Sequence, residues 1–174
     1  METEFVVLVD EHDNPTGLME KMQAHREAVL HRAFSVFLFN SKSELMLQQR
    51  ALSKYHSPGL WTNTCCSHPR ETETVKQAAD RRLLEEMGMK ADVHQVFWFI
   101  YKAEVGQGLT EHELDHVLIG FTDNEPVINP SEVESWKFES LDNIKKSMGQ
   151  YPELYTVWFR IIFERVCNYL ENNK

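Results

Sequence analysis

The stretch Ser67–Met89 reads SHPRETETVKQAADRRLLEEMGM and carries the strongest fold signal in the chain. Within it, apolar residues recur every four positions: Val75, Ala79, Leu83 and Met87. This spacing predicts an amphipathic helix over Glu73–Gly88, with its apolar stripe facing a core. Gly88 is a good C-terminal stop, because glycine adopts a left-handed backbone conformation without steric cost.

The polar residues of this stretch resemble the Nudix box, which gathers carboxylates on one helix to hold Mg²⁺ and a diphosphate. Its positions match at Glu73, Arg81, Leu83, Glu85, Glu86, Gly88 and Met89. Ser67 stands where the first Gly belongs, and Arg82 stands where a Glu belongs. A solvated face of i,i+4 ion pairs is the simpler alternative for these charges. The replacement of a carboxylate by a cation counts against diphosphate hydrolysis.

Outward from this helix, the chain alternates apolar strands with polar turns. Extended segments are predicted at Glu4–Asp10, Arg32–Asn40, Glu44–Arg50, Trp61–His68, Val93–Ala103, Leu114–Thr122 and Trp136–Phe138. The second and third of these segments flank a polar turn and read as a hairpin, and Asp13–Gly17 has strong turn chemistry. Pro152–Asn172 is predicted as one long C-terminal helix. The expected fold is α/β of the α+β type, a mixed β-sheet sandwiched between helices.

Composition bounds the class of protein. The chain has 174 residues, 42% of them apolar, with ten Phe, five Tyr and four Trp. We therefore expect residues 1–174 to form a single globular domain. There is no apolar run of membrane-spanning length, and the first residues lack the pattern of a signal peptide. A cytoplasmic protein without a membrane partner is expected, and no assembly signal argues against a monomer.

Net charge and cysteine content limit the kinds of partner and the compartment to be expected. The formal net charge is −9, which is unfavourable for nucleic-acid binding. A small anion can still bind where a few cations or a metal ion converge. The three Cys include the adjacent pair Cys65 and Cys66, which does not resemble a disulfide framework. A reducing compartment is expected, where a free thiol is available for chemistry.

Two pairs of polar residues gain interest from strand geometry. In an extended segment, residues two apart point to the same side, so Cys66 and His68 share a face and Cys65 points away. By the same parity, Glu111 and Glu113 share a face if their segment is extended. Taken alone, a buried Cys beside a solvent-facing His and a solvated acidic loop are the simpler interpretations of these two pairs.

Three of the histidines, with the two carboxylates, suggest a metal-binding site. His25 and His31, with His68 and the two carboxylates, would supply nitrogen and oxygen ligands that suit Zn, Mn or Fe. The spacing alone is weak evidence, because the chain has eight His residues.

Together, these residues resemble the family of type 1 isopentenyl-diphosphate delta-isomerases, which have a Nudix fold. The resemblance runs from about Glu4 to the C-terminal helix. The stretch Trp61–Pro69 (WTNTCCSHP) is its most specific mark. Others are Thr16–Lys21, His25, His31, Ala33–Ser35, Arg50–Lys54, Arg81–Gly88, Tyr101, Glu111–Glu113 and Trp158.

The resemblance implies roles for individual residues. Cys66 and Glu113 resemble the two acid/base groups, and Tyr101 resembles the hydroxyl that assists at the glutamate. The ligands of a tightly held divalent metal (Mn²⁺, Zn²⁺ or Mg²⁺) would be His25, His31, His68, Glu111 and Glu113. Glu86, with the backbone carbonyl of Cys66, resembles the site of an Mg²⁺ that arrives with the diphosphate. The residues that resemble substrate contacts are Lys21, Arg50, Lys54, Arg82 and the indole of Trp158.

The family converts isopentenyl diphosphate to dimethylallyl diphosphate in isoprenoid biosynthesis, by proton addition and removal through a tertiary carbocation. Two proton-transfer groups on opposite faces of a flat alkene permit both steps without moving the substrate. In this interpretation Arg82 serves to hold the diphosphate, which is an anchor and not a leaving group.

Two alternatives remain open at the level of sequence. One is a Nudix pyrophosphatase acting on a nucleotide or coenzyme, which the box spacing favours and Arg82 disfavours. The other is a zinc site that only stabilises the fold. Structural zinc sites usually have four Cys or His ligands, and adjacent Cys65 and Cys66 would chelate poorly.

Overall fold

The computed structural model describes residues 3–173. Its strands are β1 (Phe5–Val9), β2 (Pro15–Glu20), β3 (His31–Phe39), β4 (Glu44–Arg50), β5 (Trp61–Thr62), β6 (Cys65–Ser67), β7 (Val93–Gly106), β8 (Leu109–Phe121) and β9 (Val133–Ser140). Its helices are α1 (Lys21–Glu27), α2 (Val75–Met87), α3 (Leu141–Gln150), the 3₁₀ turn η1 (Pro152–Leu154) and α4 (Val157–Asn172).

Strand β3 is the centre of the mixed sheet. It pairs in parallel with β8, from His31 opposite Glu113 to Phe39 opposite Phe121, and antiparallel with β6. Strands β7 and β8 form a long antiparallel hairpin. Almost every residue of β3 is buried, because both faces of this strand are covered. A near-continuous apolar sequence is typical of such a strand.

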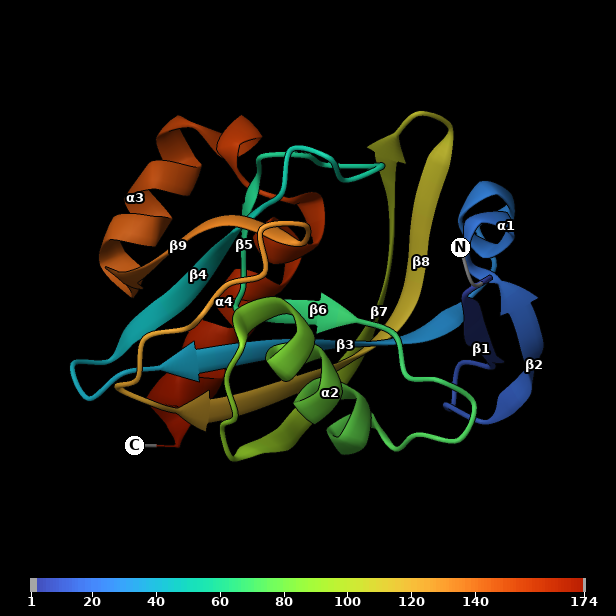
Figure 1. Cartoon of the computed structure of the whole chain (residues 1–174), viewed down its shortest axis with the longest axis horizontal. Coiled ribbons are helices and arrows are strands. Elements are labelled where there is room, and N and C mark those ends of the chain that lie inside the picture. Colours follow the sequence, from blue (N-terminus) through green and yellow to red (C-terminus); the bar gives the residue numbers. More distant parts are fainter. Residues whose placement is uncertain (1–2, 174) are drawn as a thin grey trace.

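Helices cover both faces of the sheet (Figure 1). Helix α2 lies on one face, where Phe34, Val36 and Leu38 join its Ala79 and Leu83 in one core cluster. Helix α4 lies on the other face, where its Phe159 stacks on Phe37 with ring centroids 6.3 Å apart. The predicted sheet between helices is confirmed, and so is its α+β character. None of the helices in residues 3–173 is long and apolar enough to cross a membrane.

Helix α2 agrees closely with its prediction. It begins two residues later than expected, because Thr74 caps it: the Thr74 side chain accepts from the Gln77 backbone N–H, and Gln77 caps in return. Gly88 ends the helix with φ of +60°. A Cβ there would lie 2.2 Å from the Val127 carbonyl oxygen, so only glycine fits.

Strands β3 and β4 form the predicted hairpin, but they separate directly after the turn. Strands β3 and β4 pair only at Phe39 and Leu45, and β4 then pairs with β9 and β5 instead. Side chains fill the gap: the Thr64 hydroxyl donates to the Met46 carbonyl (2.7 Å) and accepts from the Leu38 N–H (2.9 Å). The predicted continuous strand Trp61–His68 is therefore broken at this point into β5 and β6.

The predicted position of the turn near the N-terminus is wrong. The expected turn Asp13–Gly17 lies earlier, where Asp10 accepts from the backbone of His12 and Asn14, and Pro15 already begins β2. Proline is tolerated at the start of an edge strand because no partner needs its missing N–H. Helices α1 and α3 and strand β2 were not predicted from the sequence either.

The expected helix Pro152–Asn172 is interrupted. Pro152 starts only the 3₁₀ turn, and the chain is extended at Tyr155 and Thr156 before α4 begins. The Thr156 N–H donates to the Trp61 carbonyl (3.0 Å), and the hydroxyls of Thr156 and Thr62 are 3.0 Å apart. This tie to β5 fixes where the first turn of α4 begins.

Candidate active site

A cavity lies where β6, β8, α2 and the loop of residues 51–60 meet. Its wall includes the three residues predicted to be catalytic: Cys66, Tyr101 and Glu113. It also includes the five predicted to contact substrate: Lys21, Arg50, Lys54, Arg82 and Trp158. The remaining candidates His68, Glu86 and Glu111 line it too. His25 and His31 are fully buried, in the same group of side chains as Glu111. The structure thus brings every predicted site residue to one place.

Strand β6 presents the candidate thiol. Cys65 is fully buried in the core cluster beneath α2, whereas Cys66 points to the opposite face and borders the cavity, as strand parity predicted. Ser35 of β3 lies directly across from Cys66 in the sheet register. Burial raises the pKa of the Cys66 thiol well above its ordinary value, so the thiol keeps its proton at neutral pH.

Strand β8 presents the carboxylates. It begins at Leu109, earlier than predicted, so Glu111 and Glu113 are in an extended strand and share a face. Tyr101 lies opposite Glu113 in the β7–β8 register, and its hydroxyl donates to Glu113 Oε2 over 2.6 Å. Burial, together with the charge of Glu113, raises the pKa of Tyr101 well above its ordinary value. The tyrosine is therefore a fixed hydrogen-bond donor to the carboxylate.

Five side chains converge on one point at the cavity wall. One ligand atom from each lies within 4.8 Å of all the others, and the five residues are His25, His31, His68, Glu111 and Glu113. They come from α1, β3, the end of β6 and β8. This group could hold a metal ion.

Backbone carbonyls orient the two deepest imidazoles. His25 Nδ1 lies 2.5 Å from the Lys21 carbonyl, and His31 Nδ1 lies 2.8 Å from the Val29 carbonyl. A ring nitrogen facing a carbonyl must carry the hydrogen, so in the neutral form of either ring the Nε2 lone pair faces the cluster. Metal-ligating histidines commonly donate their second ring N–H in this way.

Three of the atoms at the centre of the cluster lack a hydrogen-bond partner. His25 Nε2 and Glu111 Oε2 are 2.9 Å apart, outside hydrogen-bonding geometry, and His31 Nε2 is 3.6 Å from Glu113 Oε1. Within the described chain, both His Nε2 atoms and Glu111 Oε2 are buried without a hydrogen-bond partner. Burial lowers the pKa of His68 to about 4, so this ring is neutral and able to ligate. Lone pairs crowded in this way fit a divalent cation.

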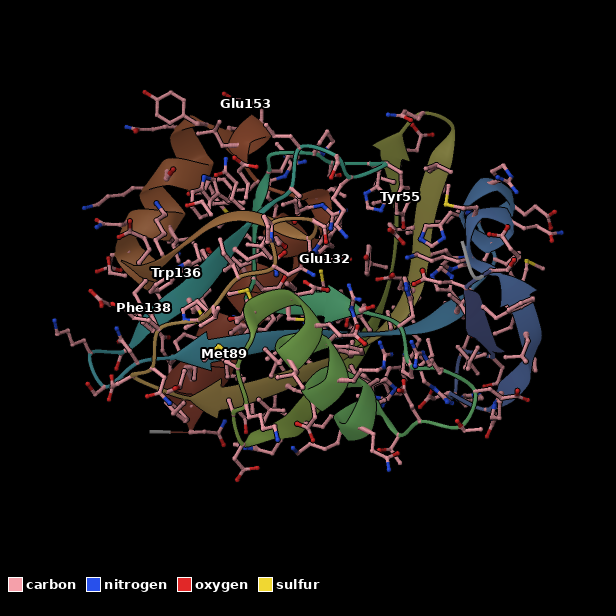
Figure 2. The ribbon with its side chains drawn as sticks, viewed as in Figure 1. Tyr55, Met89, Glu132, Trp136, Phe138 and Glu153 are labelled. Carbon is pink, nitrogen blue, oxygen red and sulfur yellow. The ribbon has the colours of Figure 1, made fainter. Side chains whose placement is uncertain are left out.

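Another part of the cavity wall is cationic, and carboxylates bind three of its four cations: Lys21, Lys54 and Arg82. Glu132 binds both Lys54 and Arg82, and Figure 2 shows it beside α2. Arg82 also donates to Glu86 (2.5 Å) and Glu85 (2.8 Å), whereas Lys21 donates to Glu4 (2.8 Å).

Arg50 is held differently. It donates to the carbonyls of His56 and Ser57, and its guanidinium lies 5.2 Å from the ring centroid of Trp158.

The two adjacent arginines of α2 have separate tasks. Arg81 forms a bidentate pair with Glu73 (2.6 and 2.8 Å) outside the cavity wall. Arg82 borders the cavity, and so does Glu86, whose second oxygen accepts from Gln48 Nε2 (2.9 Å). Arg81 and Glu73 of the box therefore stabilise the helix, whereas Arg82 and Glu86 face the cavity.

Three residues of the site were not predicted from the sequence: Tyr55, His56 and Glu132. Tyr55 and His56 lie in the loop between β4 and β5, which extends toward the β7–β8 hairpin (Figures 1 and 2). This loop has no periodicity that would have marked either residue. Glu132 is one of 27 acidic residues in the chain, and only its contacts distinguish it.

Comparison with known proteins agrees with this geometry. A family model for the NUDIX domain matches residues 29–159, so the fold and the altered box are those of a NUDIX-domain protein. An isopentenyl-diphosphate Delta-isomerase of Pectobacterium atrosepticum is 52% identical over 94% of this chain and 92% of its own length. A second enzyme of that name, from Aromatoleum aromaticum, is 50% identical over 94% of this chain and 86% of its own length. The chain belongs to the isopentenyl-diphosphate Delta-isomerase family.

Solved structures resemble the fold at low sequence identity. A crystal structure of a Deinococcus radiodurans protein aligns with a TM-score of 0.79 at 20% identity, covering 93% of this chain and 98% of that one. The MutT protein of Methanosarcina mazei aligns with a TM-score of 0.64, also at 20% identity, covering 83% of this chain and 96% of that one. These likenesses support the fold alone.

Proposed function

We propose that this chain interconverts isopentenyl diphosphate and dimethylallyl diphosphate, the reaction that the names of its relatives describe. One observation carries the proposal for this chain itself. A thiol (Cys66) and a tyrosine-bound carboxylate (Glu113) line the same cavity as four side chains that can anchor a diphosphate: Lys21, Arg50, Lys54 and Arg82.

In the proposed reaction, the substrate gains one proton and loses another. One member of the Cys66–Glu113 pair adds a proton to the terminal alkene carbon, which leaves a tertiary carbocation. The other member removes a proton from the carbon two positions away, and the double bond re-forms there. Because the thiol keeps its proton at neutral pH and the carboxylate is ionised, the pair contains one acid and one base at the start.

Trp158 is the proposed stabiliser of the cation. Its indole lines the cavity, and one of its contacts is already the Arg50 guanidinium. An aromatic face near a desolvated cation contributes about 0.5–2 kcal/mol. The other aromatic side chains of the cavity wall, Phe34, Tyr55 and Tyr101, would help to exclude water, which would otherwise capture the carbocation.

The diphosphate is proposed to bind as a complex with Mg²⁺. Three of the four cavity cations, Lys21, Lys54 and Arg82, are already paired with carboxylates, so a bare diphosphate would meet little net positive charge. Glu86, with the Cys66 backbone carbonyl, would hold the Mg²⁺ that balances the anion. The diphosphate stays intact and anchors the alkene between the two proton-transfer groups.

A second divalent ion, Mn²⁺, Zn²⁺ or Mg²⁺, is proposed for the site of three histidines and two glutamates. The crowded lone pairs of His25, His31 and Glu111 support this assignment. When bound, the ion would favour the ionised form of Glu113, since a nearby cation stabilises a carboxylate. Tyr101 would hold the other oxygen of Glu113 in place throughout.

Product analysis tests the proposal against a pyrophosphatase. Incubation with isopentenyl diphosphate and Mg²⁺ should yield dimethylallyl diphosphate without release of phosphate. Release of phosphate or a monophosphate, without movement of the double bond, would favour the pyrophosphatase alternative.

We further propose that residues 1–174 act as one domain and as a monomer in the cytoplasm, without nucleic-acid or membrane partners. The net charge of −9 supports the absence of a nucleic-acid partner. Light scattering after size exclusion measures the oligomeric state, and a mass near 20.4 kDa is expected.

A further inference from the structure

His56 lies in the cavity wall but outside the five-residue group of candidate ligands. It belongs to the loop between β4 and β5 and is only 4% exposed. A buried histidine in an irregular loop requires partners for both ring nitrogens.

Both ring nitrogens of His56 have such a partner. Its Nε2 lies 3.1 Å from Glu111 Oε1, and its Nδ1 lies 3.3 Å from the Ser57 hydroxyl oxygen. The Ser57 hydroxyl can donate to Nδ1, which leaves the ring hydrogen on Nε2. His56 then donates to Glu111, which accepts only.

The two oxygens of Glu111 therefore face different imidazoles. Oε1 faces His56, whereas Oε2 faces His25 at 2.9 Å and His31 at 4.0 Å. A carboxylate rotates about its last bond unless a partner fixes it. A hydrogen bond at Oε1 directs Oε2 toward the imidazole cluster.

The surroundings of His56 hold the ring firmly. Its carbonyl accepts from Arg50 (3.1 Å), and its ring packs edge-on against Tyr55 and Trp158, with centroids 4.5 and 5.7 Å away. The His56 ring thus contacts the indole proposed to stabilise the carbocation and the carboxylate proposed to ligate the metal.

We propose that His56 is a positioning residue for the metal site: it binds one oxygen of Glu111 so that the other faces His25, His31 and His68. This inference rests on the metal site of the proposed function. Groups that orient a metal ligand by a hydrogen bond change metal affinity by about 10- to 100-fold when removed. His56 therefore sets the affinity of the site without touching the metal.

Two variants of similar size separate this role from simple packing. The amide nitrogen of His56→Gln falls near the position of Nε2, whereas that of His56→Asn falls near Nδ1 and is too short to reach Glu111. Mn²⁺ and Zn²⁺ dissociation constants are measured by competition with a chelator, and thermal melts of the metal-free proteins report folding. His94→Asn, at an exposed position of β7, is the matched control.

The expected result is that His56→Asn weakens metal binding about 10- to 100-fold, whereas His56→Gln and His94→Asn stay within about threefold of wild type. Equal affinity in both His56 variants and wild type would overturn the role of His56 and leave the metal site intact. A wild-type protein that binds neither ion would overturn the proposed metal site as well. Equal losses of affinity and of melting temperature in both His56 variants would indicate packing alone, which also overturns the inference.

Discussion

Tyr101 and Glu113 face each other across the β7–β8 hairpin, and the Tyr101 hydroxyl donates to Glu113 Oε2 over 2.6 Å. The other carboxylate oxygen, Oε1, lies 2.9 Å from His68 Nε2. Glu113 thus has one oxygen fixed by a phenol and the other turned to the imidazole cluster. In the proposed mechanism, this arrangement would let a single carboxylate ligate a metal and exchange a proton with substrate.

Tyr101→Phe should lower kcat by about 10- to 100-fold, because a hydrogen bond to a charged group contributes about 1.5–3 kcal/mol. The metal affinity should change little, since the ligand atoms remain. Steady-state kinetics and chelator competition measure the two quantities. Tyr151→Phe, at a site 52% exposed, should behave as wild type. An unchanged kcat in Tyr101→Phe would remove the phenol from the mechanism.

Arg82→Gln should raise KM for isopentenyl diphosphate by about 10- to 100-fold, because one cation of the proposed anchor is lost. Arg81→Gln is the matched control: it removes the neighbouring arginine, which pairs with Glu73 outside the cavity wall. Thermal melts separate a loss of folding from a loss of binding. If both variants shift KM equally, the division of tasks along α2 is wrong.

Saturation with Mn²⁺ or Zn²⁺ should raise the melting temperature of the metal-free protein. An ion at 100 times its dissociation constant adds about 2.7 kcal/mol, which corresponds to roughly 5–10 °C for a chain of this length. His25→Ala should abolish the increase, and His94→Ala should keep it. A shift that survives His25→Ala would place the ion elsewhere.

His116, which is not part of the five-residue group, should make stability depend on pH. His116 on β8 lies 3.0 Å from Asp13 Oδ2, and Asp13 also binds Arg32 (2.7 Å). Burial lowers the pKa of His116 below its ordinary 6.5, although Asp13 opposes this. As the pH falls below about 6.5, the unfolded chain gains a proton that the folded chain resists, so this contribution to stability is lost.

Urea unfolding of the metal-free protein at pH 7.5 and 5.5 measures that contribution. His116→Gln, which cannot titrate, should lose less stability between the two pH values than wild type does. Identical losses in the two proteins would show that His116 does not contribute.

Much of the fold was readable from local patterns. The four-residue spacing of Val75–Met87 located α2, and the parity of Cys65 and Cys66 assigned them to opposite faces of the sheet. The parity of Glu111 and Glu113 held because β8 extends further back than its apolar residues indicate. Its polar start pairs with β7, and pairing with β3 begins at Glu113; local sequence reveals neither contact.

The features that sequence missed depend on tertiary contacts. Thr64 fills the gap between β3 and β4 with a side chain, and the tie from Thr156 to β5 delays the start of α4. His56 and Glu132 enter the site from irregular segments, where no periodicity applies. Their importance follows from distances to Glu111, Lys54 and Arg82 that only the folded chain defines.

Isomerisation in deuterated water tests the central claim most directly. The Cys66–Glu113 account predicts that isopentenyl diphosphate with Mg²⁺ and metal-replete protein yields dimethylallyl diphosphate carrying deuterium from solvent, detected by NMR and mass spectrometry. Cys66→Ala should lose nearly all of this activity, and Cys65→Ala, which alters the core beneath α2, should retain deuterium incorporation. The absence of an allylic product from the wild-type protein, or full activity in Cys66→Ala, would contradict the account.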